Sequence, residues 1–358
     1  MKKLIQKKAF LGISASVISI IIGFVFGFLV LLASNPANAV GGFMTILMGG
    51  FSEGMKGTGN VLYFATPIIL TGLSVGFAFR TGLFNIGASG QFILGAFTAI
   101  YIGVRWTFIP PSILWIVALL GAAVAGGLWA MVPGLLKAFR NVNEVISSIM
   151  MNYIGMYIVN FMVVQTVFDS AKNQSITPYA ATIPKLGLEY IFPDSSINFG
   201  FIIALAVAIL IYIILQKTVF GFELKACGFN RHASEYAGMN SKRNIWLSML
   251  IAGALSGLGG GLLYLAGSGK HIQVVDVLAQ EGYTGISVAL LGLSNPIGII
   301  FAGIFIAYIT IGGFYMQVYR YAPEVINIMI AVIIYLSAFS LFFRGKIADI
   351  IKRIGVKA

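Results

Sequence analysis

Long apolar runs recur along the whole of the 358-residue chain, and several reach the roughly 20 residues that a helix needs to cross a bilayer. Only 9% of the residues are charged, whereas a soluble globular domain carries about 25%. A water-soluble fold could not cover its surface with so few charges. We therefore predict an all-α fold, a polytopic bundle of transmembrane helices.

The positions of the apolar runs predict about ten transmembrane spans within a single domain, residues 1–358. The spans are expected at residues 9–33, 61–79, 83–103, 113–133, 144–165, 198–216, 245–267, 275–293, 296–313 and 324–343. Interior glycine or polar residues in the third and eighth spans make each a candidate for a broken or re-entrant helix. The first run, about 25 residues, exceeds the roughly 7–15 apolar residues of a cleaved signal peptide, so it is interpreted as an uncleaved span.

The lysines and arginines predict how the spans are threaded. With the N-terminus in the cytoplasm, 17 of the 23 basic residues fall on the cytoplasmic side and 6 on the outer side. Such a bias is typical of membrane proteins, so both termini are predicted to be cytoplasmic. The same bias accounts for the net charge of +12 and leaves no reason to expect a nucleic-acid partner.

Two loops stand out by length, an outer loop at residues 166–197 and a cytoplasmic loop at residues 217–244. Neither can hold a soluble domain.

The nearest match to a phosphate-binding loop, Gly267-Ser-Gly-Lys-His271, lacks the first glycine and has histidine where serine or threonine is required. The single cysteine and the two widely separated histidines offer no metal-ligand spacing. The chain is therefore predicted to be no enzyme and to bind neither a metal nor another cofactor.

The cytoplasmic loop contains a segment that can form a short helix. Asn230 can cap its start and Gly238 can end it, because asparagine and glycine suit those positions. The residues singled out are Asn230, Arg231, Ala233, Glu235, Tyr236, Ala237 and Gly238, of which Ala233, Tyr236 and Ala237 would form a small apolar face. Such a helix can dock a separate protein at the membrane surface. The alternative is an ordinary solvated connector.

Polar residues within or at the ends of the predicted spans are candidates for contact with a transported solute, because burying them in hydrocarbon is costly. These substrate-path candidates are Asn85, Gln91, Glu144, Asn152, Glu281 and Asn327. Amides suit an uncharged polar solute such as a nucleoside or a sugar. The alternative is a structural role, in which the amides bridge or cap helices and Glu144 stabilises the first turn of its own helix.

A ridge of small residues lies on the seventh predicted span. Gly253, Gly257 and Gly261 recur every fourth residue and so share one face of a helix. Small residues let two helix backbones approach closely in a membrane. The ridge is predicted to pack against a helix of this chain or of a partner.

Three segments carry a resemblance to a known family. Residues 71–96 contain Phe84-Asn-Ile-Gly87 followed by Gly90-Gln91, residues 141–154 read NVNEVISSIMMNYI, and residues 224–239 read LKACGFNRHASEYAGM. They resemble permeases of ATP-binding-cassette importers of the branched-chain amino acid, ribose and nucleoside group, and the second segment favours the nucleoside branch. The third resembles the family pattern LRAxGxNxxAAxxAGI, from which it departs at Cys227 and Ser234.

The resemblance implies a permease subunit of an ATP-driven nucleoside importer in a bacterial plasma membrane. It also implies three partners: a second permease subunit that is a non-identical homologue, a cytoplasmic ABC ATPase that uses the ATP, and an extracytoplasmic substrate-binding lipoprotein. Residues 230–238 would then contact the ATPase. From the residues alone, an ion-coupled secondary transporter stays open as an alternative, although the few carboxylates of the predicted spans lie near helix ends.

Overall fold

The computed structural model describes residues 2–338, which are mostly helical. The described α-helices are α1 (Lys2–Ser34), α2 (Ala39–Met48), α3 (Gly54–Arg80), α4 (Ala88–Arg105), α5 (Pro111–Arg140), α6 (Glu144–Thr166), α7 (Leu188–Ile191), α8 (Gly200–Lys217), α9 (Val219–Phe229), α10 (Arg231–Tyr236), α11 (Ser241–Tyr264), α12 (Gln280–Leu291), α13 (Pro296–Tyr315) and α14 (Pro323–Ala338). The 3-10 helices are η1 (Pro36–Asn38), η2 (Gly49–Phe51), η3 (Tyr179–Ala181) and η4 (Met316–Tyr319). A small antiparallel hairpin, β1 (Phe168–Asp169) and β2 (Gln174–Ser175), lies in the long loop at residues 166–197. The helical fold class is confirmed.

Each predicted span contains a helix of the structure. Seven described helices are long and apolar enough to cross a membrane, namely α1, α3, α5, α6, α8, α11 and α13. The remaining predicted spans hold α4, α12 and α14, which are shorter or less apolar. The number of crossings and the cytoplasmic placement of the termini stay predictions. Residues 339–343 of the last predicted span lie outside the described residues, as do the basic residues that follow them.

The two spans that were candidates for broken helices each begin with a non-helical stretch. Residues 81–87 separate α3 from α4, and residues 265–279 separate α11 from α12, which starts five residues later than predicted. α2 was missed by the hydropathy reading because its ten residues are too few to span a bilayer. The two non-helical stretches lie next to the polar candidates, since Asn85 is in the first and Glu281 follows the second.

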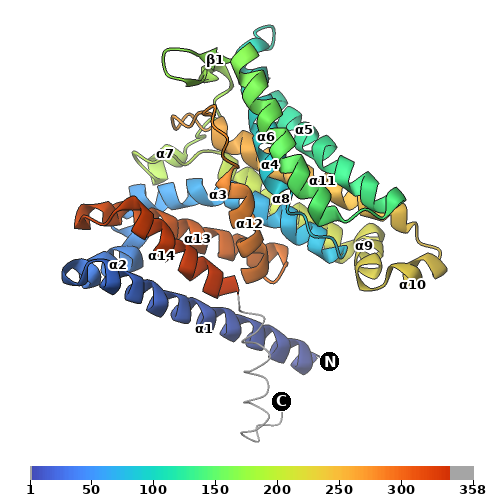
Figure 1. The fold of residues 1–358 in the computed structure, drawn as a ribbon, viewed down its shortest axis with the longest axis horizontal. Coiled ribbons are helices and arrows are strands. Elements are labelled where there is room, and N and C mark those ends of the chain that lie inside the picture. Colours follow the sequence, from blue (N-terminus) through green and yellow to red (C-terminus); the bar gives the residue numbers. More distant parts are fainter. Residues whose placement is uncertain (1, 339–358) are drawn as a thin grey trace, which may run out of the picture.

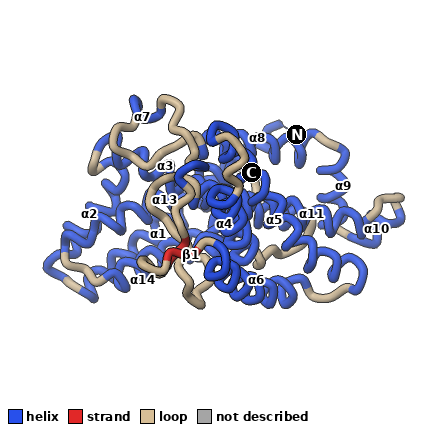
Figure 2. The backbone as a smooth tube through the Cα atoms, turned by 90° about the horizontal axis from the view of Figure 1, so that it is seen from above, coloured by secondary structure: helices blue, strands red, loops and turns tan. Residues whose placement is uncertain are grey.

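The helices form two groups that meet along α3. α1, α2, α13 and α14 lie on one side, and α4, α5, α6 and α11 lie on the other (Figures 1 and 2). The first group has its own core, which includes Leu31, Met316 and Met329. α3 is the most buried of the long helices, because it packs against α11 on one side and against α12 and α13 on the other.

The glycine ridge of α11 packs inside the chain. Gly257 lies so close to α5 that a methyl group on it would come within 2.9 Å of the Gly126 Cα atom, and Gly253 touches the backbone of the same residue. Gly261 faces Ala122 on α5. The prediction of close packing is confirmed, with α5 as the partner helix.

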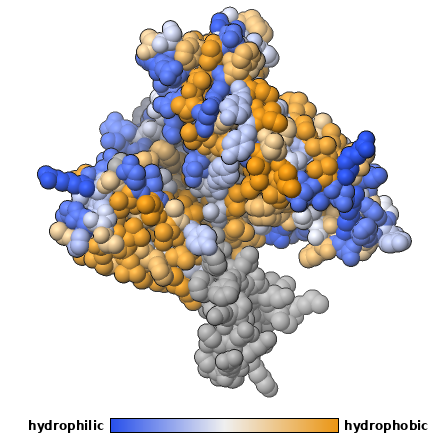
Figure 3. Space-filling model, in the orientation of Figure 1, coloured by the Kyte–Doolittle hydropathy of each residue, from blue (hydrophilic) through white to orange (hydrophobic). Residues whose placement is uncertain are grey.

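Large apolar side chains are exposed along the outer faces of the helices. Figure 3 shows broad hydrophobic areas over both helix groups, with hydrophilic residues gathered at the ends of the molecule. On α5 the exposed residues include Leu120 and Val124, and on α6 they include Ile146 and Phe161. A soluble protein does not expose apolar surface on this scale, so these faces are suited to contact with lipid or with another membrane protein.

Candidate functional site

Three of the predicted substrate-path residues form a buried network at the break between α3 and α4. The Asn85 Nδ2 atom donates to Gln91 Oε1, and Gln91 Nε2 donates back to Asn85 Oδ1, both at 2.9 Å. Asn85 Nδ2 also donates to Ser74 Oγ at 3.0 Å. Asn85 and Gln91 are at most 1% exposed. The two amides therefore satisfy each other, as buried polar groups must.

Asn152 on α6 joins this network by capping the broken backbone. Its Oδ1 atom accepts from the Gly90 backbone N–H at 2.8 Å, and its Nδ2 atom donates to the Ile86 carbonyl at 3.0 Å. Both partners belong to the stretch where α4 starts, and a helix start leaves N–H groups without partners inside the helix. Asn152 therefore holds α6 to the start of α4.

Glu144 does not reach this network. It lies in the first turn of α6, two turns before Asn152, and its carboxylate pairs with Lys137 Nζ of α5 at 2.9 Å. Asn143 caps the same helix by accepting from the backbone N–H groups of Val145 and Ile146. These contacts favour the structural alternative for Glu144.

The other two predicted path residues, Glu281 and Asn327, line a cavity of about 510 Å³ between the two helix groups. Its lining also includes Phe64, Lys270, Thr284 and Phe314. Neither this lining nor that of the neighbouring cavity includes Asn85, Gln91, Glu144 or Asn152. The structure thus divides the six predicted residues between a closed network, a helix start and an open cavity.

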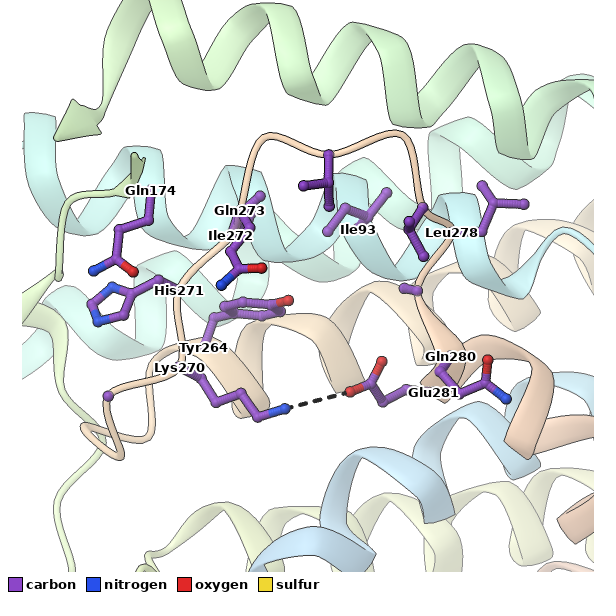
Figure 4. A pocket seen from close by; sticks show the side chains of 14 residues that line it. Ile93, Gln174, Tyr264, Lys270, His271, Ile272, Gln273, Leu278, Gln280 and Glu281 are labelled. Atoms are coloured by element: carbon purple, nitrogen blue, oxygen red, sulfur yellow. Dashed lines mark ion pairs between the residues drawn. The ribbon is translucent and has the colours of Figure 1, made fainter. Parts of the chain in front are cut away.

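An ion pair lies where this cavity meets a neighbouring one of about 500 Å³. Lys270 Nζ and Glu281 Oε1 lie 3.9 Å apart, and Figure 4 shows the two side chains facing each other. Both residues, together with Gln280, line both cavities. The second cavity continues past Tyr264 towards His271 and Gln174 (Figure 4).

Aromatic rings stand beside the ion pair. The Phe64 and Phe314 ring centroids are 6.0 Å apart with an interplanar angle of 46°, and Lys270 Nζ lies 5.9 Å from the Phe64 centroid. A lysine over a ring face gains a cation–π attraction. The lining therefore combines flat apolar surfaces with two amides, two hydroxyls and one pair of opposite charges.

The loop that carries Lys270 is fixed at two points. The Ser268 hydroxyl lies 2.6 Å from the Tyr63 hydroxyl of α3. Further along, Ile272 and Ser175 of β2 exchange hydrogen bonds of 2.9 and 3.0 Å. The β1–β2 hairpin and α3 therefore hold the loop that brings Lys270 to the cavity.

The start of α12 places Glu281 and is fixed by α4. Ser89 Oγ donates to the Ala279 carbonyl at 2.8 Å, and Gly282 lies directly against the Ser89 backbone. A methyl group on Gly282 would come within 2.9 Å of the Ala88 carbonyl carbon. Glu281 thus lies in the first turn of α12, where the helix dipole stabilises a carboxylate.

Lys270, Phe64 and Phe314 were not selected from the sequence. Their positions are far apart along the chain, and only tertiary packing brings them together. The sequence around Lys270 is rich in glycine, but it was interpreted only as an incomplete phosphate-binding loop and not as part of a solute site. Within the described residues no group of three or more His, Cys, Asp or Glu side chains could hold a metal ion.

The segment at residues 230–238 has the local structure that its sequence predicts. α10 covers Arg231–Tyr236, Asn230 Oδ1 accepts from the Ala233 N–H at 3.0 Å, and Gly238 has a φ of +81°. That φ lies in the left-handed region that glycine favours at the end of a helix. The predicted cap and end of this helix are confirmed.

One side of α10 is attached and the other is open. Ser234 is buried, and its hydroxyl lies 3.3 Å from Cys227 Sγ and 3.1 Å from Ser241 Oγ, which ties α10 to α9 and α11. Tyr236 is 94% exposed, and Phe229 at the end of α9 is 91% exposed. Two fully exposed aromatic residues beside a short, anchored helix form a surface suited to a protein partner.

The end of α9 touches the break between α3 and α4. A methyl group on Gly228 would lie 2.6 Å from the Arg80 carbonyl oxygen and 2.9 Å from the Gly82 nitrogen. Gly82 itself has a φ of +73°, so it forms the turn that ends α3. A backbone-to-backbone contact therefore joins the end of α9, next to α10, to the start of the buried amide network.

Comparison with known proteins identifies the kind of chain to which this arrangement belongs. Residues 57–338 match the model of a family described as branched-chain amino acid transport system / permease component. The chain is 40% identical over 334 residues to the guanosine ABC transporter permease protein NupP of Bacillus subtilis, covering 92% of this chain and 95% of that protein. No solved structure matches significantly.

Two further relatives are similar over most of their length. The nucleoside ABC transporter permease protein NupB of Lactococcus lactis is 33% identical over 327 residues, covering 90% of this chain and 89% of that protein. The glucose ABC transporter permease protein TsgB13 of Haloferax volcanii is 30% identical over 355 residues, covering 95% and 91%.

Proposed function

The chain belongs to the family of permease components of branched-chain amino acid transport systems, and we propose that it carries nucleosides across the membrane for an ATP-driven importer. It is a multi-pass protein of the bacterial plasma membrane. The names of the relatives NupP and NupB support a nucleoside as the solute.

The cavity beside the Lys270–Glu281 pair is the observation that carries the choice of solute. Its volume of about 510 Å³ falls in the usual range for small-ligand sites, roughly 300–1,000 Å³. Its rings suit a flat base, and its amide and hydroxyl groups suit a sugar. A neutral solute fits a lining whose two opposite charges already balance each other.

The energy would come from a separate ATPase, as is usual for this family of permeases. We place its contact at α10, with Tyr236 and Phe229 as the exposed anchors and Arg231 and Glu235 fixed to each other by an ion pair of 3.2 Å. Aromatic residues are frequent anchors in protein interfaces. The predicted coupling residues Asn230 and Gly238 would set the shape of α10.

A movement of α10 has a continuous physical route to the cavity. It begins at the contact between Gly228 and Gly82, and it continues through the amide network at the start of α4. It ends where Ser89 and Gly282 join α4 to α12, which carries Glu281. Closure of the ATPase would thus change which side of the membrane the cavity faces.

The remaining partners in this proposal are a second permease and an extracytoplasmic binding lipoprotein. Bacillus subtilis and Lactococcus lactis each have a second, more distant relative of this chain, named for the same solute as the first. This pairing supports a partner permease that is a homologue and not a second copy.

Deletion of residues 230–238 tests the function directly. We expect uptake of radiolabelled guanosine to be lost in cells while the protein still inserts in the membrane, because the proposed contact with the ATPase is removed and none of the seven long apolar helices is shortened. Membrane insertion is checked by blotting the membrane fraction. Unchanged uptake would contradict the proposal, and uptake that survives ATP depletion but stops with a proton uncoupler would favour an ion-coupled transporter instead.

A further inference from the structure

The Lys270–Glu281 pair is loose enough for each of its two charges to bind a ligand that approaches from the cavity. Its separation of 3.9 Å exceeds the roughly 2.7–2.9 Å of a close charge-assisted hydrogen bond. The Lys270 and Glu281 side chains are 42% and 25% exposed, so both reach the cavities. Each charged group therefore keeps hydrogen-bonding capacity that the protein does not use.

We propose that Glu281 and Lys270 recognise the Watson–Crick edge of guanine, which rests on the proposed nucleoside function and names the base within it. A carboxylate only accepts hydrogen bonds, and it does so best from two adjacent donors. Guanine offers two, N1–H and N2–H, next to the acceptor O6. The Glu281 carboxylate would accept the two donors and the Lys270 ammonium group would donate to O6.

The other common bases match this pair less well. Adenine and cytosine each present one amino donor beside a ring nitrogen that accepts, and uracil presents one N–H between two carbonyl oxygens. With each of these bases, one carboxylate oxygen of Glu281 has no N–H group to accept from, and it can lie against another acceptor. A site built for two donors rejects a base that lacks one, because a charged group is then left without its partner.

The surroundings of the pair supply the rest of a nucleoside site. Phe64 and Phe314 provide ring faces on which a base can stack. Thr284 and Asn327 lie in the same lining, and the Asn327 side chain makes no hydrogen bond to any described residue. The Asn327 amide is available to the sugar hydroxyls, and the Thr284 hydroxyl, which donates to the Gln280 carbonyl at 3.1 Å, can accept from them. Glu281 lies in the first turn of α12, so its position at the cavity is fixed by the start of that helix.

The test measures base preference by competition in cells that contain the complete importer. Uptake of guanosine, inosine and adenosine is compared for the native chain, for Glu281→Gln, and for the control Glu53→Gln. Glu53 pairs with Lys56 outside both cavity linings, so its change removes a carboxylate elsewhere on the same chain. The binding lipoprotein is the same in every strain. Its own selectivity therefore cancels when the ratio of guanosine uptake to adenosine or inosine uptake in a variant is divided by the same ratio for the native chain.

In Glu281→Gln we expect the guanosine-to-adenosine and guanosine-to-inosine ratios to fall on the order of ten-fold, since one of two charge-assisted bonds is lost. Glu281→Asp, which keeps a carboxylate, should retain part of the preference, and Glu53→Gln should retain all of it. Equal loss of all three nucleosides at a normal protein level would overturn the proposal, and so would unchanged ratios. Absence of any nucleoside uptake by the native chain would instead overturn the proposed function.

Discussion

Two groups of polar side chains in this protein were selected by the same rule and have opposite surroundings. At the start of α4, Asn85, Gln91 and Asn152 are buried, and their amides are paired with one another or with backbone groups. At the start of α12, Glu281 and nearby Asn327 face an open cavity. The rule that a polar residue inside a membrane has a function does not distinguish these two groups. They differ in whether the hydrogen bonds of each side chain are already satisfied within the protein.

The difference in hydrogen bonding suits the two groups of side chains to different roles. A saturated network is rigid, because any movement of one member leaves another member unpaired in a medium of low polarity. An open lining is free to exchange its partners with a solute. The first group is therefore suited to transmit movement, and the second is suited to bind.

The largest expected effect is on stability, and it comes from the closed network. Asn85→Leu should lower the free energy of unfolding by about 3 kcal/mol, because it leaves the buried Gln91 amide without its partner. Thermal unfolding of the purified protein in detergent measures this. The matched variant Asn327→Leu, in the open cavity, should change stability by less than about 0.5 kcal/mol. Equal losses in the two variants would remove the distinction between the groups.

A smaller effect is expected at the joint between the groups. Gly282→Ala inserts a methyl group against the Ala88–Ser89 backbone and should cost about 1–3 kcal/mol, together with a fall in uptake. The paired readings are thermal unfolding and guanosine uptake in cells. Ser287→Ala on the same helix serves as the control and should alter neither. Normal uptake in Gly282→Ala would show that α4 and α12 need not move together.

The smallest effect is expected at Glu144. Glu144→Gln removes a partly buried ion pair with Lys137 at 2.9 Å and should lower stability by no more than about 1 kcal/mol. Guanosine uptake should stay within two-fold of the native level, roughly the change that 0.4 kcal/mol produces. A loss of uptake well beyond that range would return Glu144 to the residues that contact the solute.

Much of the local structure could be predicted from the sequence. The apolar runs predict the long helices, and Asn230 and Gly238 predict both ends of α10, because each of these signals acts over a few neighbouring residues. The ridge of α11 was also readable, since glycine at every fourth position has few other uses in a membrane helix. α2 was not readable, because a ten-residue apolar helix has no distinct signature.

The composition of the cavity could not be predicted in the same way. Phe64, Lys270 and Phe314 come together only through the packing of α3, α13 and the loop before α12. The sequence also could not separate Gln91 from Asn327, because both are amides in apolar surroundings. Their difference depends on which groups from other helices lie within hydrogen-bonding distance.

The contact between Gly228 and Gly82 has a consequence for protein engineering. It consists of backbone atoms alone, so the only side-chain requirement at either position is that there be none. Residues that line the proposed solute cavity, such as Phe64, Phe314 and Asn327, can be randomised without touching it. Under the proposed function, a library built on those positions would change the solute that is carried and leave the contact with the ATPase as it is, which would make this chain a modular scaffold for importers of altered selectivity.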